Sequence, residues 1–550
     1  MSFRRVAQLA AVVLASLVCL SCGQVYRPVV IPTTTVPPSP SNFHTVFGIS
    51  TSTSFNPNVN GQGVWSNFPG AAMEIDVSGD TILGETGPNS GTLDMVANPT
   101  HAVALPNFSR IFVANAGSVA FNTATNQPEP DIVYAFVPAA DSTVSTGFGT
   151  ANIFSLPTSG PPGSLAGNYP NLPDFVATTQ SNTIYVANYG TETSTVNGIV
   201  STDSIAVLNT AQNTISRIVY LSPGAHPVAM AVTPNGSKLY VANQGNNTVS
   251  SFNTVDMSTN TLTGFTGTLP VWVVARGDNQ KVYVLTQGDG QLVTIDTATD
   301  AVTGNLPVGA GANFILYDAH LQRLYVTSPA TSTLFVFATS FTDSQGVLHD
   351  ALQQLAAIPI SGSVGCAGCT NSRPVSVAAL PDGSRVYVAS FQLSSTCTES
   401  DPANTGTCQV IPLVTVVDAA SFAVKTTLTP LTSAQSSAVP PSVPELGACI
   451  ASTPYNPGVI SLGAVPSVQS VRFRLSATAA ADSSHVYVSI CDAGSVADII
   501  TTPSSVSTGG NNVPDVLVTD LPTPFGVCTN TPTCSTQPPL QTPIWLFPGQ

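Results

Sequence analysis

The stretch PVAMAVTPNGSKLYVAN, residues 227–243, contains the unit that decides the fold. Two short apolar runs flank the turn Thr233–Ser237, in which the Asn-Gly pair supplies the positive φ that a tight hairpin needs. A third run follows at residues 248–252, and a fourth starts at Asn260. The pattern predicts four antiparallel strands in a unit of about 40 to 45 residues, the size of one propeller blade.

Seven segments carry the same aromatic-Val or Tyr-Val strand. They are Ile111–Asn115, Ile184–Asn188, Leu239–Asn243, Val282–Val284, Leu324–Val326, Val386–Ser390 and Val486–Val488. The steps between their aromatic residues are 73, 55, 43, 42, 62 and 100 residues, so the shortest steps set the unit and the longer ones contain loops. The runs are apolar on both faces. A closed ring of units buries both faces of every unit, whereas an open stack would leave two apolar end faces exposed.

These observations predict an all-β, seven-bladed β-propeller of four-stranded antiparallel blades over residues 98–515. Within it, residues 391–412 and 430–470 are expected to be cystine-bearing insertions. Residues 43–97 precede the first unit and are expected to close the ring by lending outer strands to the last blade. An eighth blade is the alternative, but seven is preferred because this segment contains no Tyr-Val strand. Residues 516–550 are interpreted as a strand followed by a Pro-rich tail.

The repeat resembles the YVTN-type β-propeller family, named for a Tyr-Val-Thr/Ala-Asn strand. The best matches are residues 233–243 and the segment Pro381–Ala389, and the resemblance covers roughly residues 98 to 500. It implies a seven-bladed propeller on a bacterial surface, related in shape to lactonase-like propellers. It does not imply one activity.

The N-terminus resembles a bacterial lipoprotein signal. Arg4 and Arg5 precede a mostly apolar stretch that is too short to span a bilayer, which needs about 20 residues. The sequence Cys19–Gly23 resembles a lipobox, although Cys19 stands where that family usually has Leu. The resemblance implies that residues 1–21 are a signal peptide and that Cys22 carries lipid. A plain secretory signal and an uncleaved anchor are the alternatives.

Residues 22–42 are interpreted as a lipid-anchored linker, because four prolines fall within residues 32–40. With 14 Lys and Arg against 29 Asp and Glu, the chain has a formal charge of −15 and lacks the basic content of a nucleic-acid binder. We expect an exported monomer of the cell envelope, at the outer membrane or cell surface. Its expected partners are the membrane, through the anchor, and an envelope protein or glycan.

Ten cysteines are present, and eight remain when Cys19 and Cys22 are set aside. An even number in an exported chain favours disulfides. Proximity suggests the pairs Cys366–Cys369, Cys397–Cys408, Cys449–Cys491 and Cys528–Cys534. The CxxC spacing of the first pair also suits a redox or metal site, but the surrounding helix that lowers a thiol pKa and a second pair of ligands are missing from the sequence. No metal or cofactor is expected.

Candidate ligand-binding residues come from aligning the seven aromatic residues. The positions fourteen residues before them are Asn98, Asn171, His226, Leu269, Gly311, Arg373 and Phe473. This position precedes the innermost strand, so it is expected at one mouth of the central channel, where propeller loops converge. The candidates are Asn98, Asn171, His226 and Arg373, with His101 nearby; His226 and Arg373 are the weak catalytic candidates. The alternative is a polar lining that only solvates the channel.

Three functions remain open. The preferred one is a lipid-anchored, non-catalytic binding or scaffold protein for protein or glycan partners, because the sequence lacks recognisable catalytic motifs in a supporting context. The second is a lactonase-like hydrolase or a lyase at the channel mouth. The third is a structural component of a surface layer.

Overall fold

The structure of the chain is a computed structural model. It describes residues 44–549 apart from these gaps: 57–63, 79–80, 86–97, 120, 123–126, 129, 139–151, 180–182, 197, 261, 363–367, 395–396, 398–407, 432–441, 446–448, 452–453, 458, 463–464, 470, 502–514 and 523–540. The signal peptide and linker, including Cys22, therefore lie outside the described residues.

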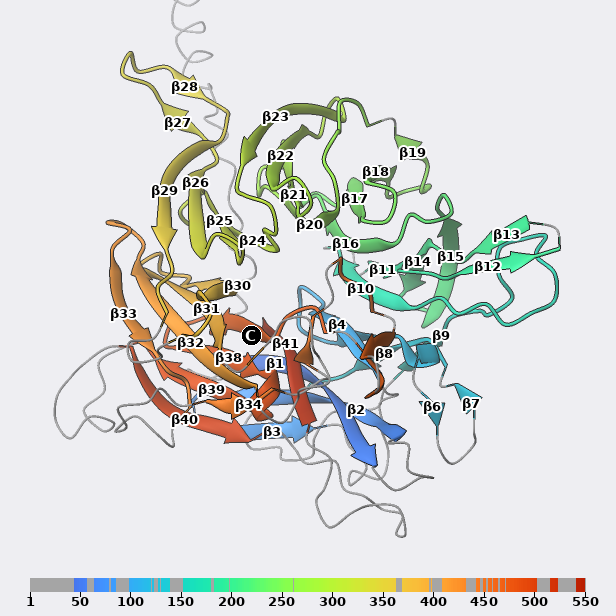
Figure 1. Cartoon of the computed structure of the whole chain (residues 1–550). Helices are drawn as coiled ribbons and strands as arrows, with labels where there is room; N and C mark the ends of the chain where they lie inside the picture. The colour runs from blue at the N-terminus through green and yellow to red at the C-terminus, as the bar shows by residue number, and fades with distance from the viewer. Residues whose placement is uncertain are drawn as a thin grey trace, which may run out of the picture. The chain divides into compact units, whose positions relative to one another are not determined.

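Among the described residues, eight antiparallel sheets form the blades (Figure 1): seven have four strands, and the remaining one has four strands and a short fifth one, β34 (Val443–Pro444). In chain order, the first four blades are as follows. Blade 1 is β4 (Pro99–Ala104), β5 (Ile111–Asn115), β8 (Ile132–Phe136) and β9 (Asn152–Ser155); blade 2 is β10 (Pro173–Thr178), β11 (Thr183–Asn188), β14 (Ser204–Asn209) and β15 (Thr214–Tyr220); blade 3 is β16 (Pro227–Val232), β17 (Lys238–Asn243), β18 (Thr248–Asn253) and β19 (Thr259–Asn260); blade 4 is β20 (Pro270–Ala275), β21 (Lys281–Thr286), β22 (Gln291–Asp296) and β23 (Ala301–Pro307).

Blades 5 to 7 also consist of strands that follow one another in the chain. Blade 8 combines strands from both ends of the chain. Blade 5 is β24 (Phe314–Asp318), β25 (Arg323–Ser328), β26 (Thr333–Ala338) and β29 (Gln353–Pro359); blade 6 is β30 (Arg373–Ala379), β31 (Arg385–Leu393), β32 (Gln409–Asp418) and β33 (Val424–Leu428), with β34 (Val443–Pro444) paired to β32; blade 7 is β37 (Leu475–Ala479), β38 (His485–Ile490), β39 (Ser495–Ile500) and β40 (Val516–Pro522); blade 8 is β41 (Gln541–Pro548), β1 (Thr45–Asn56), β2 (Val64–Asp76) and β3 (Thr81–Glu85).

Short hairpins and single turns decorate this core. They are β6 (Phe121–Asn122) with β7 (Gln127–Pro128), β12 (Glu192–Thr195) with β13 (Gly198–Ser201), β27 (Phe341–Thr342) with β28 (Leu348–His349), β35 (Val459–Leu462) with β36 (Val465–Gln469), and the 3-10 turns η1 (Gly117–Val119) and η5 (Cys491–Ala493). The β27–β28 and β12–β13 hairpins project from their blades in Figure 1.

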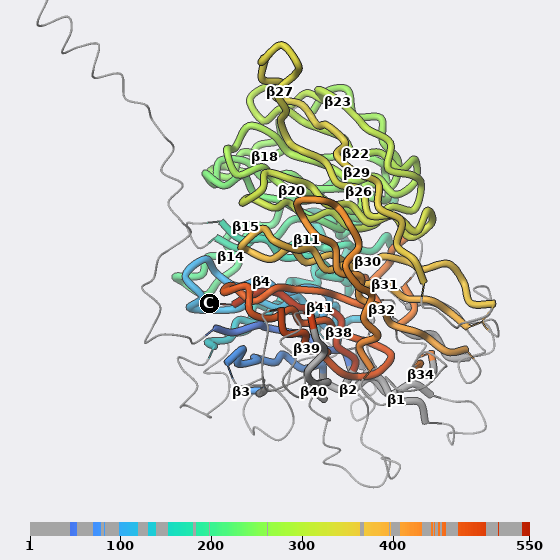
Figure 2. Tube along the Cα trace, turned by 90° about the vertical axis from the view of Figure 1, so that its left-hand side faces the viewer, coloured from blue at the N-terminus to red at the C-terminus, as the bar shows by residue number. Residues whose placement is uncertain are grey.

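The innermost strands form a closed ring. Each first strand packs against the first strand of the next blade, from β4 through β37, and β41 fills the place between β37 and β4. Figure 2 shows β4 and β41 side by side although they come from opposite ends of the chain. The described residues thus form a toroid in which every blade has two neighbours.

The predicted number of seven blades is wrong, because the two ends of the chain build an eighth. β41 supplies its inner strand, and β1 pairs with it in antiparallel register from Val46 opposite Pro548 to Ser52 opposite Gln541. A Tyr-Val strand is not needed here, because Phe47 and Ile49 of β1 and Leu546 of β41 provide the buried side chains instead. Pairing strands from both termini closes the ring through main-chain hydrogen bonds.

Burial explains why the repeating strands lack alternation. In the second strands β17 and β21, nearly every residue is buried, whereas the outer strands β15 and β23 are largely exposed or half-buried. Six tyrosines of the repeat are among the largest fully buried side chains: Tyr185, Tyr240, Tyr283, Tyr325, Tyr387 and Tyr487. These side chains are buried because the inner strands carry apolar groups towards a neighbouring blade on each face.

Candidate functional site

One mouth of the ring is built from two sets of loops. The residue before an inner strand has a left-handed backbone, with φ of 66° at Asn98, 45° at His226 and 50° at Leu269. Its carbonyl accepts a hydrogen bond from the loop after the second strand, as in Gln244 N to His226 O at 3.1 Å. In blade 2 this position is Leu172, one residue after Asn171. The two loop sets therefore meet at one end of the sheets.

A cavity of about 760 Å³ opens among these loops in blades 4 to 7. Blades 4 and 5 contribute Val271, Gln287, Gly311, Asn313, Pro329 and Ala330; blade 6 contributes Thr370, Asn371, Arg373, Val375, Phe391, Leu393 and Cys397; the segment leading to blade 7 contributes Glu445, Cys449, Ile450, Ala451, Tyr455, Arg472, Phe473 and Arg474. This volume falls within the usual range of small-molecule sites.

Aromatic side chains fill the ring beside the cavity. Trp272 of β20 lies against Phe473 at 5.6 Å and against Trp545 of β41 at 6.0 Å between ring centroids. Phe314 of β24 contacts Trp272 at 5.0 Å in the same cluster. Trp272, Phe314 and Phe473 are all buried. These aromatic side chains, together called the aromatic plug, fill the central channel where they lie. The cavity is a pocket beside the aromatic plug.

Arg472 crosses the ring to fix this arrangement. Its Nη1 lies 3.3 Å from a carboxylate oxygen of Asp174 on β10 and donates to the Val228 carbonyl of β16, while Nη2 donates to the Val271 carbonyl of β20 at 2.8 Å. The guanidinium also sits 4.8 Å from the centre of Trp272. One side chain from the segment before blade 7 therefore binds to blades 2, 3 and 4.

Tyr455 completes the contact at Asp174. Its hydroxyl donates to the second carboxylate oxygen of Asp174 at 2.7 Å, and Arg472 lies over its ring at 5.1 Å. Burial is the largest influence on Asp174 and raises its pKa from 3.8 to about 6, although Arg472 and Tyr455 both act to lower it. Burial also lowers the pKa of Arg472. The desolvation of this ion pair outweighs the mutual attraction of its partners.

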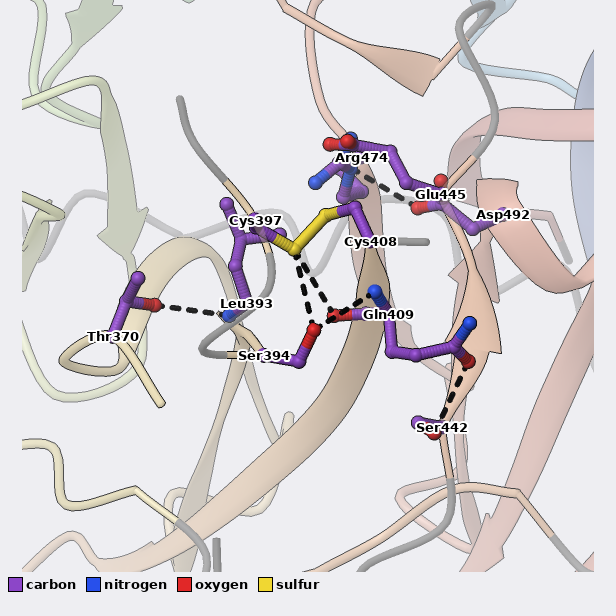
Figure 3. Close-up of a disulfide and its surroundings, with 10 residues drawn as sticks. All are labelled: Thr370, Leu393, Ser394, Cys397, Cys408, Gln409, Ser442, Glu445, Arg474 and Asp492. Carbon is purple, nitrogen blue, oxygen red and sulfur yellow. Dashed lines mark hydrogen bonds and ion pairs between the residues drawn. A yellow bond between two sulfur atoms is a disulfide. The ribbon is translucent and has the colours of Figure 1, made fainter. Parts of the chain in front are cut away.

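Arg474 anchors a further part of the cavity wall. It forms ion pairs with Glu445 at 2.7 Å and with Asp492 at 3.0 Å, and its Nε donates to the Cys449 carbonyl. Figure 3 shows Arg474, Glu445 and Asp492 near the Cys397–Cys408 disulfide. A second disulfide, Cys449–Cys491, ties the Glu445–Tyr455 segment to blade 7. The wall is therefore cross-linked both covalently and electrostatically.

These two disulfides are among the four pairs that proximity in the sequence predicts, and both are confirmed. Cys369 is also disulfide-bonded. Its predicted partner Cys366 lies outside the described residues, as do Cys528 and Cys534. Disulfides are typical of a non-reducing compartment, which fits an extracytoplasmic location.

Of the five residues predicted to bind a ligand, Arg373 lines the cavity. Its guanidinium lies 5.9 Å from the centre of the Phe391 ring, which Arg474 also contacts, at 4.9 Å. Burial, followed by the nearby charge of Arg474, lowers the pKa of Arg373, while Glu445 acts in the opposite direction. This cation thus belongs to the same electrostatic group as the Arg474–Glu445 wall.

The other four predicted residues are not among the residues that line this cavity. Asn98 donates to the Ala116 carbonyl, and Asn171 donates to the Pro157 carbonyl. His101 stacks on Phe175 at 3.9 Å between centroids, and burial lowers its pKa well below 6.5.

His226 pairs with Asp203 and Tyr189 of blade 2. Its Nδ1 lies 2.9 Å from the Tyr189 carbonyl and 3.1 Å from an Asp203 carboxylate oxygen, and its ring stacks on Tyr189 at 4.3 Å. Burial acts to lower the pKa of His226, but Asp203 and the Tyr189 carbonyl outweigh it and raise the value. The structure therefore does not bring His226 and Arg373 together in this cavity.

Arg472, Glu445 and Tyr455 were not singled out from the sequence. One signal was present: Arg472 and Arg474 flank a single residue immediately before a repeat strand, in a chain with only 14 basic residues. Their acidic partners carry no such signal, because Asp174 is 298 residues away from Arg472.

In the part of the chain that the structure describes, no group of three or more His, Cys, Asp or Glu side chains is arranged to hold a metal ion. Within the same described residues, none of the helices combines the length and apolar character required to cross a membrane.

Comparison with solved structures returns other β-propellers. A periplasmic gluconolactonase from Pseudomonas aeruginosa is 16% identical, with 70% of this chain and 95% of that chain covered and a TM-score of 0.41. A Bacteroides fragilis protein assigned as a 6-phosphogluconolactonase is 14% identical, with 71% and 97% covered and a TM-score of 0.42. A hydrazine synthase from Kuenenia stuttgartiensis is 15% identical, with 64% and 87% covered and a TM-score of 0.37.

No protein-family model matches the sequence, and none of the curated proteins compared with it does. Because each of these three structures is less than 25% identical and has a TM-score below 0.5, nothing about activity or substrate follows from the likenesses.

Proposed function

We propose that this protein is a non-catalytic binding propeller of the cell envelope and that its cavity holds part of a glycan. The observation that carries the proposal is the uncharged polar lining supplied by Gln287, Asn313, Thr370 and Asn371. Gln287 Oε1 is buried and has no hydrogen-bond partner among the described residues. Such an oxygen is costly unless a ligand hydroxyl or a water donates to it.

The nucleophile candidates that line the cavity are already engaged, which favours binding over catalysis. Cys397 and Cys449 are in disulfides. The Tyr455 hydroxyl donates to Asp174, and the Thr370 hydroxyl oxygen accepts from the Leu393 amide at 2.9 Å. An activated nucleophile would instead need an adjacent base.

Titration calorimetry of the purified protein with a panel of neutral and acidic oligosaccharides tests the proposal. We expect Gln287→Leu to weaken saccharide binding roughly 2- to 12-fold, the worth of one hydrogen bond. Gln345→Leu, on the exposed β27–β28 hairpin, is the matched control and should leave the affinity unchanged. A panel in which no saccharide binds would overturn the proposal.

The anchoring part of the proposal rests on the lipobox-like sequence at Cys22. We expect the full-length protein to partition into the detergent phase and Cys22→Ser to partition into the aqueous phase. Equal partitioning of the two proteins would remove the anchor. This measurement is independent of the cavity.

Lactone hydrolysis is the second candidate. Its support is that Arg373 and the Glu445 carboxylate line the same cavity and interact electrostatically, and a cation and a carboxylate are groups that can stabilise an oxyanion and activate water. Turnover of a lactone panel by the unmodified protein, abolished in Glu445→Gln, would establish it. His226→Ala tests the role predicted from the sequence for a residue outside the cavity lining.

A further inference from the structure

We propose that the cavity binds a neutral N-acetylated saccharide, whose acetamido group occupies the part of the cavity formed by Gln287, Asn313 and Ala330. This inference rests on the proposed glycan-binding function and names the ligand class. The three residues line the cavity from loops of blades 4 and 5, and together they are called the amide corner.

Main-chain contacts hold the residues of the amide corner close together. The Gly311 amide, two residues before Asn313, donates to the Gln287 carbonyl at 2.7 Å and so joins the loops of blades 4 and 5. A methyl group in place of a Gly311 hydrogen would meet the Ala330 Cβ at 3.1 Å, so the Ala330 side chain lies beside the same loop. The loop that precedes β24 therefore connects all three residues.

The amide corner offers one hydrogen-bond acceptor and one donor. The Oε1 atom of Gln287 is buried and has no partner among the described residues, so it requires a donor from a ligand. The Oδ1 atom of Asn313 accepts a 2.8 Å hydrogen bond from the buried Thr327 hydroxyl, which leaves the amide nitrogen of Asn313 to donate. A secondary amide matches both groups, because it has one N–H donor and one carbonyl acceptor.

The apolar part of the corner distinguishes an acetamido group from a pair of hydroxyl groups. Pro329 and Ala330 line the cavity, and neither side chain can form a hydrogen bond. A hydroxyl placed against them would lose its contact with water and gain no new partner, whereas a methyl group gains free energy by leaving water. The corner therefore suits the N–H, the carbonyl and the methyl of one acetamido group.

The charges around the cavity are balanced, which favours a neutral ligand. The described lining includes three arginines, and three carboxylates lie against them; these residues are Arg373, Arg472, Arg474, Asp174, Glu445 and Asp492. Arg472 is bound to Asp174 at 3.3 Å, and Arg474 is bound to the other two carboxylates at 2.7 and 3.0 Å. A charged ligand would have to displace one of these partners or remain uncompensated at a partly desolvated site. A neutral saccharide avoids both costs.

The position of the corner favours a saccharide over a peptide, which also carries secondary amides. Peptides commonly bind to sheets by adding a strand to an exposed edge. The amide corner instead consists of loops beyond the ends of β21, β24 and β25, and each of these strands is paired within its own blade. Thr370 and Asn371 line the cavity from blade 6 and offer polar groups to ring hydroxyls that point in other directions.

Calorimetry of the full chain with matched probes tests the inference. The probes are tri-N-acetylchitotriose, cellotriose, trigalacturonate and N-acetyl-trialanine amide; cellotriose has hydroxyl groups where the first probe has acetamido groups. We expect tri-N-acetylchitotriose to bind at least roughly 10-fold more tightly than cellotriose, the combined worth of one hydrogen bond and one buried methyl group. Trigalacturonate should bind no more tightly than cellotriose, because the charges of the cavity are already balanced.

Two substitutions test the amide corner. Ala330→Asp, at an exposed residue, places a charge where the acetamido methyl is expected and should reduce the affinity for tri-N-acetylchitotriose to that for cellotriose. Gln287→Leu removes the acceptor and should weaken binding of the acetylated probe roughly 2- to 12-fold. Ala319→Asp, at an exposed residue of the turn between β24 and β25, is the matched control at the other end of blade 5 and should leave both affinities unchanged. Circular dichroism of each variant checks folding.

The outcomes separate this inference from the proposed function. Equal affinities for tri-N-acetylchitotriose and cellotriose, or an unchanged preference in either folded variant of the corner, overturn the acetamido group but retain glycan binding. Tighter binding of trigalacturonate than of tri-N-acetylchitotriose overturns the neutral ligand and also retains glycan binding. Binding of the acetylated peptide without any saccharide overturns both proposals, and so does the absence of binding by every probe.

Discussion

Arg472 and Asp174 lie 298 residues apart in the chain, and their side chains meet at 3.3 Å inside the ring. Tyr455 bonds to the same carboxylate from the segment that forms one wall of the cavity. Asp174 of blade 2 is thus bound to two side chains of the segment before blade 7, and Trp272 of the aromatic plug lies beside Arg472. The contact fixes the inner wall of the cavity, so its energetics bear on both stability and binding.

The stability of the protein should depend on the protonation of Asp174. Burial raises the pKa of this group from 3.8 to about 6. The pKa of Asp174 is higher in the folded protein than in the unfolded chain. Protonated Asp174 therefore contributes to the free energy of unfolding fully below about pH 4, and this contribution is lost as the pH rises through about 6. Relative to Asp174→Asn, the unmodified protein should lose about 3 kcal/mol across that window.

Denaturant unfolding at pH 3.5, 5 and 7 measures this difference. The comparison with Asp174→Asn is essential because other carboxylates act in the opposite direction; hydrogen bonds from Lys281 lower the pKa of Asp296, for example. A free-energy difference between the two proteins that stays constant over this range would contradict the prediction.

The Cys449–Cys491 disulfide should stabilise the protein more than Cys397–Cys408. The first pair closes a loop of 42 residues and the second a loop of 11. Chain entropy alone gives about 4 and about 3 kcal/mol for these loops. We expect the double substitution of Cys449 and Cys491 by Ser to lower Tm more than the same change at the other pair, as measured by calorimetry. The reverse order would show that local packing dominates.

Loss of the Trp545 side chain should destabilise blade 8, which closes the ring. Trp545 contacts Trp272, Phe473 and His101 from β41. Trp545→Ala is expected to cost about 3–5 kcal/mol through the cavity it leaves. Leu348→Ala, at a 69% exposed residue of β28, is the control and should cost less than about 0.5 kcal/mol. Equal stabilities in urea unfolding would show that β41 is dispensable.

A buried carboxylate links two neighbouring blades. Asp300 of blade 4 accepts hydrogen bonds from Lys238 and Tyr240 of blade 3, both at 2.5 Å. Asp300→Ala leaves the lysine without its anion and should cost about 3–5 kcal/mol. Asp289→Ala, in an exposed turn of the same blade, should change stability by less than about 1 kcal/mol in parallel unfolding experiments. A similar loss in both variants would contradict this assignment.

The eighth blade could not be predicted from the repeat in the sequence. Seven blades carry a local signal, because each contains its own second strand with an aromatic residue followed by Val. The eighth is assembled from β41 and β1–β3, so its strands are separated by nearly the whole chain. Repeat spacing reports contacts between near neighbours in sequence, and no repeat spacing links residue 45 to residue 548.

The candidate site was predicted in the same partial way. At Asn98, His226 and Leu269 the aligned position directly precedes an inner strand and has a left-handed backbone, and Arg373, which begins β30, lies in the cavity lining. The alignment also selected Asn98 and His226, whose side chains bond to neighbouring loops. The alignment fixes where the backbone of a residue lies, but the direction of its side chain depends on what the next blade offers.

The sequence alone determined that the chain is a β-propeller, because hairpin turns and doubly apolar strands recur at a spacing that only stacked blades can bury. The tertiary structure decided the number of blades, the filling of the channel and the walls of the cavity. Each of these depends on groups such as Arg472 and Asp174 that only ring closure brings together. Local sequence patterns specify each four-stranded sheet, whereas closure of the ring depends on contacts among all the blades together.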